Sequence, residues 1–135
     1  MAATIWATPG RNPYIETQLA LLAELDDTVA ASAGAATPTD ADVLLRDIAT
    51  EAGFCDIGLS LLEHSIGVDD LRSFFINQTA TTPWAPVVGR LLPSEQNQLA
   101  DEFVARLGIE MAEPDRLPFC SHMIRCQKSS RNGWL

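Results

Sequence analysis

The chain has 135 residues, is 47% hydrophobic and carries a formal net charge of -9, which predicts a single globular domain and excludes a disordered one. Its acidic surface would repel phosphate backbones, and no apolar run approaches the roughly 20 residues of a membrane span, so we expect no nucleic acid and no membrane as partners. There is no basic and apolar signal segment, and the three cysteines form no CxxC pair. These features predict a cytoplasmic protein.

The first elements are expected to be a short strand and a long helix. Residues 2–7 are short, apolar and tolerant of β-structure, and residues 8–13 break the strand with two prolines and a glycine. A helix then begins near Pro13 or Tyr14, because proline is favoured in a first turn. Residues 32–39 are small and are predicted as a loop. The helix is marked by an apolar stripe of Ile15, Leu19, Leu22, Leu25 and Val29.

A second helix and a strand follow this loop. Asp40 or Asp42 is expected to cap the helix, whose apolar stripe runs from Ala41 to Ala52. Gly53 ends the helix, since glycine adopts a left-handed conformation at the lowest cost. Residues 57–62 then form a mostly buried strand.

The C-terminal half is predicted to hold two helices and a last strand. One short helix starts at Asp69 or Asp70, residues 79–86 are irregular, and a second helix starts at Pro93. Residues 113–115 form a turn, and the last strand covers 117–127. The predicted order of strands and helices is typical of a small sheet covered by four to five helices. We expect one domain over residues 1–128 and a flexible tail over 129–135.

Several segments follow one another as they do in one enzyme family. Thr4-Ile5-Trp6 ends a strand in an aromatic residue, Asn12-Pro13-Tyr14 enters a helix, and residues 48–54 turn from helix to strand at Gly53. With the closing segment 117–128, this order resembles the C-terminal half of a class I (Rossmann-like) S-adenosylmethionine-dependent methyltransferase, over about residues 2–128. The resemblance implies an α/β fold with a small mixed sheet of about three strands, an antiparallel last strand, and a helical insertion over residues 69–113.

The cofactor-binding half of that family has no counterpart in the sequence. The glycines are scattered singly, and no two have the GxG spacing that lets a backbone approach a cofactor. We therefore expect that the chain alone binds no cofactor and is inactive, and that S-adenosylmethionine would bind only if the missing half were supplied.

The same resemblance predicts a partner. In the intact fold the first strand has a neighbour on its far side, and without one its backbone groups would be unpaired. We expect either a homodimer or a complementary N-terminal methyltransferase half. An alternative function is a non-catalytic homodimeric binding or scaffold protein derived from a methyltransferase, and a third is a truncated product with no retained role.

The resemblance also implies a substrate site near the end of the first strand and under the helical insertion. Its expected occupant is a small apolar or aromatic molecule, and no catalytic residue is named. For the phenylalanines of the insertion, core packing is the alternative explanation. The expected substrate-binding residues are Trp6, Asn12, Tyr14, Phe75 and Trp84.

Other polar and thiol groups have simpler explanations. Cys120, His122 and Cys126 share one face of the last strand, but the extended spacing puts the two cysteines too far apart for one metal ion, so buried thiols are expected. His64, beside Glu63 at a strand end, has no partner for catalysis that the sequence can name. The paired aspartates 26–27 and 69–70 are expected to cap helices.

Overall fold

The computed structural model describes residues 1–36, 38–110, 113 and 115–128. The segment 129–135, expected to be a tail, lies outside the described residues, as does Pro114 of the expected turn. No helix in the described part of the chain is long and apolar enough to cross a membrane. The elements are β1 (Ala2–Trp6), a 3-10 helix η1 (Pro9–Arg11), α1 (Pro13–Leu25), α2 (Asp27–Ala36), α3 (Ala41–Glu51), β2 (Phe54–Gly67), α4 (Leu71–Thr79), α5 (Ala85–Gly89), α6 (Pro93–Glu110) and β3 (Arg116–Lys128).

The three described strands form one sheet in the order β1-β3-β2. Ser121 of β3 lies opposite Trp6 of β1 and Leu62 of β2, and both pairings are antiparallel. The structure thus confirms a small α/β fold with three strands and an antiparallel last strand. A mixed sheet would contain a parallel pair of strands. The described strands form no such pair, because β3 lies between β1 and β2 and is antiparallel to both.

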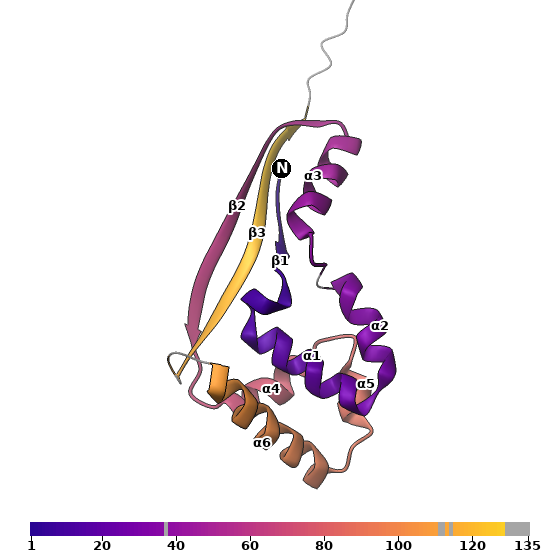
Figure 1. Cartoon of the computed structure of the whole chain (residues 1–135), viewed down its shortest axis with the longest axis vertical. Coiled ribbons are helices and arrows are strands. Elements are labelled where there is room, and N and C mark those ends of the chain that lie inside the picture. The colour runs from indigo at the N-terminus through magenta and orange to yellow at the C-terminus, as the bar shows by residue number, and fades with distance from the viewer. Residues whose placement is uncertain (37, 111–112, 114, 129–135) are drawn as a thin grey trace, which may run out of the picture.

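The helices gather mainly at one end of the long β2–β3 ribbon, whereas α3 lies beside the other end (Figure 1). Leu117 and Phe119 of β3 belong to the large hydrophobic cluster formed with the helices, and Ile124 and Cys126 belong to a small cluster with Ala49 of α3. Because successive residues of a strand point to opposite faces, these two clusters lie on opposite faces of β3.

The described residues form six α-helices instead of the four to five expected. The long first helix is broken at Asp26, whose φ of -153° is extended. Its Oδ1 accepts hydrogen bonds from the backbone N–H of Thr28 at 3.0 Å and from the Thr28 hydroxyl at 2.6 Å, so Asp26 caps a new helix. That helix, α2, extends through most of the expected loop, and α5 begins within the stretch expected to be irregular.

The turn between α3 and β2 agrees with the sequence prediction. Gly53 has a φ of 78°, in the left-handed region. Asp40 stands at the N-cap of α3 but makes no side-chain capping bond there. At α4, by contrast, Asp70 accepts hydrogen bonds from the backbone of Arg72 and Ser73.

Candidate functional site

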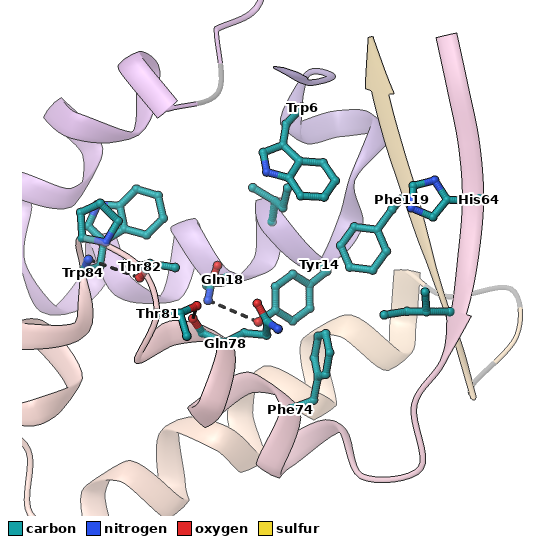
Figure 2. Close-up of a pocket in the computed structure, with 13 residues that line it drawn as sticks. Trp6, Tyr14, Gln18, His64, Phe74, Gln78, Thr81, Thr82, Trp84 and Phe119 are labelled. Carbon is teal, nitrogen blue, oxygen red and sulfur yellow. Dashed lines mark hydrogen bonds between the residues drawn. The ribbon is translucent and has the colours of Figure 1, made fainter. Parts of the chain in front are cut away.

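An aromatic cavity of about 500 Å³ lies between the sheet and the helices (Figure 2). Its walls come from β1, α1, β2, α4, the segment 81–84 and β3. The lining residues are Trp6, Tyr14, Ile15, Gln18, His64, Ile66, Phe74, Gln78, Thr81, Thr82, Pro83, Trp84 and Phe119.

Helix periodicity places the same pair of residue types on both helical walls. Tyr14 and Gln18 are four residues apart on α1, and Phe74 and Gln78 are four residues apart on α4. Residues with this spacing lie on one face of a helix. Each helix therefore presents an aromatic ring and a carboxamide, one turn apart, to the cavity.

The two indole rings are held in different ways. Trp84 is buried, and its Nε1 donates a hydrogen bond to the Ser32 hydroxyl of α2 at 2.9 Å, so its polar group is already paired. Trp6 is 42% exposed and contacts Phe119, with ring centroids 5.6 Å apart. Trp84 thus forms a fixed wall, while Trp6 forms part of the open rim.

A short polar chain lies at the base of the cavity. Gln18 Nε2 donates to the Thr79 hydroxyl oxygen at 2.8 Å and, more weakly, to the Tyr14 hydroxyl oxygen at 3.4 Å. Thr79 in turn donates to the backbone oxygen of Phe75 at 2.8 Å. Burial raises the pKa of the Tyr14 hydroxyl, so Tyr14 stays a neutral phenol. The base of the site offers hydrogen bonds without a charge.

His64 lies at the other side of the cavity, where its ring stacks on Phe119 with centroids 6.1 Å apart. Its neighbour Glu63 forms an exposed ion pair with Arg11 at 3.6 Å. No described residue pairs with the imidazole as a nucleophile or an orienting carboxylate. Stacking and lining are therefore the roles that the geometry gives to His64.

Three of the five expected site residues, Trp6, Tyr14 and Trp84, line this cavity together. Asn12 does not line it, because its carboxamide is fully buried against the end of β1. There it accepts from the Cys120 backbone N–H at 2.7 Å and donates to the backbone oxygens of Cys120 and Ala7.

Phe75 is also outside the lining. It is fully buried and stacks on Phe103, with ring centroids 4.4 Å apart. Its neighbour Phe74 faces the cavity instead, because consecutive residues of a helix point in different directions. The alternative explanation, core packing, applies to Phe75.

Gln18 and Phe119 are among the lining residues that were not predicted from the sequence. The spacing of four between Tyr14 and Gln18 was a usable signal, since it predicts a shared helix face. Phe119 had no such signal, because only the pairing of β3 between β1 and β2 brings it opposite His64.

The arrangement is suited to binding and orienting a ligand. Within the described residues, no group of three His, Cys, Asp or Glu side chains is placed to hold a metal ion. Cys120 and Cys126 are buried free thiols, as expected, and Cys55 is an exposed one.

Comparison with known proteins adds no family to this description. No protein-family model matches the chain, and no curated protein matches it in sequence. The cavity and the order of the elements are therefore what support a function.

Proposed function

We propose that the chain is the substrate-side portion of an S-adenosylmethionine-dependent methyltransferase-like protein that acts on a small molecule. The aromatic cavity is the observation that carries this proposal. Trp6, Tyr14 and Trp84, chosen through the resemblance, come from three separate segments and line one cavity. A volume of about 500 Å³ and a mainly apolar lining with a few polar groups are typical of small-molecule sites.

The order of the elements gives further support. α3 ends at Glu51, Gly53 turns the chain, and β2 begins at Phe54. The last strand is antiparallel to its neighbours. These are the features that the resemblance implies for the C-terminal half of the family.

The described residues do not fit the cofactor. Among the described glycines only Gly53 has a positive φ, and it lies outside the cavity lining. No two glycines have GxG spacing. We propose that a complementary half holds S-adenosylmethionine, which supplies an electrophilic methyl group when bound. This chain would bind and orient the acceptor, and orientation alone can provide much of a rate enhancement.

β1 offers the place where such a half would join. The backbone N–H of Ala7 donates to the oxygen of Cys120 at 3.0 Å, so the odd-numbered residues of β1 pair with β3. In an antiparallel ladder the residues between them direct their backbone groups the other way. The backbone N–H and oxygen of Thr4 thus point away from β3, along the outer edge of β1, with which no other described strand pairs. A free strand edge is a template for a strand of another chain.

Photolabelling with S-adenosylmethionine tests the proposal. The purified chain and the chain isolated with its partners from its own cells are irradiated with the tritiated cofactor. We expect label only in the complex, and on the partner. Thr4→Pro removes an outward N–H while sparing the ladder to β3, so it should reduce capture of the labelled partner. A complex without label, or label on the purified chain itself, would contradict the proposal.

A second candidate is a non-catalytic homodimeric binding protein, favoured by the same free edge, because a second copy can pair there as well. Light scattering separates the two. A purified chain with twice the mass of 14.6 kDa, reduced to a monomer by Thr4→Pro, supports the homodimer. A mass of 14.6 kDa for the unmodified chain excludes it.

A further inference from the structure

The hydrogen-bonding groups at the base of the cavity define what it can bind. The Thr79 hydroxyl donates its proton to the Phe75 backbone oxygen, so toward Gln18 its oxygen acts as the acceptor. The amide nitrogen of Gln18 must therefore face Thr79, and Oε1 must face away from it. The orientation of this amide follows from the chemistry of its neighbours.

Gln18 Oε1 accepts no hydrogen bond from the described residues, although Gln18 is only 3% exposed. Every fully enclosed side-chain nitrogen or oxygen in the described part of the chain has a partner. Oε1 is therefore not fully enclosed, and the cavity that Gln18 lines is the space that reaches it. It is a buried acceptor available to a ligand.

Tyr14, which is 4% exposed, supplies the complementary donor. Its hydroxyl oxygen accepts from Gln18 at 3.4 Å, and no described residue accepts its proton. Burial raises the pKa of this hydroxyl, so the proton is retained. One donor and one acceptor thus lie one helical turn apart at the base of an otherwise aromatic cavity.

The walls favour a flat and neutral ligand. Tyr14 makes an edge-on contact with Phe74, with centroids 5.2 Å apart, and Trp6 contacts Phe119 above the cavity. Rings of this kind bind a further ring by stacking or edge contacts. The described lining contains no Asp, Glu, Lys or Arg, and its one imidazole, His64, is stacked on Phe119, so a charged ligand would lose hydration without a permanent counter-ion.

We propose that the cavity binds a neutral, planar aromatic molecule with a hydroxyl group, whose oxygen accepts a hydrogen bond from Tyr14 and whose proton is donated to Oε1 of Gln18. This inference rests on the proposed function in that it names the ligand of the same site. Binding itself requires neither the cofactor nor a partner chain.

Two probes of similar size and shape test the polar pair. Equilibrium dialysis measures the binding of 2-naphthol and of 2-methylnaphthalene, in which a methyl group replaces the hydroxyl. Tyr14→Phe keeps the ring and removes the donor. We expect it to weaken 2-naphthol binding by about tenfold and to change 2-methylnaphthalene binding by less than about twofold, which is the effect of one lost hydrogen bond.

A second variant tests the aromatic walls away from the core. Trp6 is 42% exposed, so Trp6→Ala should lower the thermal unfolding temperature far less than truncation of a fully buried ring such as Phe103. Trp6→Ala should weaken the binding of both probes by a similar factor, since both lose the same ring contact. The anion 2-naphthoate should bind at least about tenfold more weakly than 2-naphthol, because its charge is not paired.

Three results would overturn the inference: no binding of 2-naphthol, equal losses for both probes in Tyr14→Phe, or binding unaffected by Trp6→Ala. None of these measurements involves S-adenosylmethionine. Their failure would remove this class of ligand, whereas failure of the photolabelling experiment would remove the methyltransferase proposal.

Discussion

The region around α1, α4 and α6 and the region under α3 are built very differently. In the described residues, the first buries fifteen hydrophobic side chains in one cluster, and the second buries only three. On α3, Val43, Leu44 and Ile48 remain exposed. The cavity belongs to the well-packed region, so its walls are held in place by the core. The α3 region contributes little to stability of its own and presents apolar surface to the outside.

Truncating one large apolar side chain in each region gives the sharpest test of this difference. Phe103 is fully buried and stacks on Phe75, so Phe103→Ala should lower the free energy of unfolding by about 3–5 kcal/mol. Ile48 is 53% exposed, and Ile48→Ala should change the free energy of unfolding by less than about 0.5 kcal/mol. Urea unfolding at several protein concentrations measures both.

The outcome for Ile48 decides how α3 behaves in solution. A loss comparable to that of Phe103→Ala, present only at high protein concentration, would mean that another copy covers α3. A comparable loss at every concentration would contradict the contrast between the two regions.

Asn12 joins the start of α1 to β3, and its substitution should have the next largest effect on the free energy of unfolding. Asn12→Ala leaves the buried N–H of Cys120 without its partner, at a cost of about 1–3 kcal/mol, whereas the oxygen of Cys120 keeps the hydrogen bond from the Ala7 N–H. Asn97 is an exposed residue of α6, so Asn97→Ala should be neutral or slightly stabilising. Thermal unfolding of both variants measures this, and similar melting temperatures for the two would show that Asn12 has no fastening role.

The sequence predicted the parts of the molecule that depend on neighbouring residues. The helix stop at Gly53, a strand through residues 57–62 and the last strand were found because their signals are local. The expected burial of residues 57–62 was wrong: they belong to the longer strand β2, an outer strand of the sheet on which Leu61 and Leu62 are exposed. The break at Asp26 was missed because the apolar stripe continues across it to Val29. Only the side-chain bonds from Thr28 to Asp26 show that a new helix begins there.

The candidate site was only partly predictable for the same reason. Trp6, Tyr14 and Trp84 stand beside strand ends and breaks, where ligand sites are common, and they line the cavity. Asn12 and Phe75 stand in similar places but are turned into the interior. The direction of each side chain depends on the packing of α4 against α6 and of β1 against β3, which no single segment specifies.

The smallest effect should come from the surface of the well-packed region, at Asp26. Hydrogen bonds from Thr28 and then Arg90 lower the pKa of this carboxyl from 3.8 to about 2. The folded state therefore binds fewer protons than the unfolded state, so the stabilisation is complete above the unfolded pKa of 3.8 and is lost as the pH falls through about 2. Asp26→Asn keeps a side chain able to cap α2 but removes the charge.

We expect the melting temperature of Asp26→Asn to lie slightly below that of the unmodified chain at about pH 6, and the two to converge at about pH 2. Because the carboxyl is near the surface, added salt should also reduce the difference. Asp47→Asn is the matched control, since Asp47 is exposed and makes no hydrogen bond or ion pair with the described residues. A difference between Asp26→Asn and the unmodified chain that persists unchanged at about pH 2 would show that it arises from the shape of the cap. The charge would then have no part in joining α1, α2 and α5.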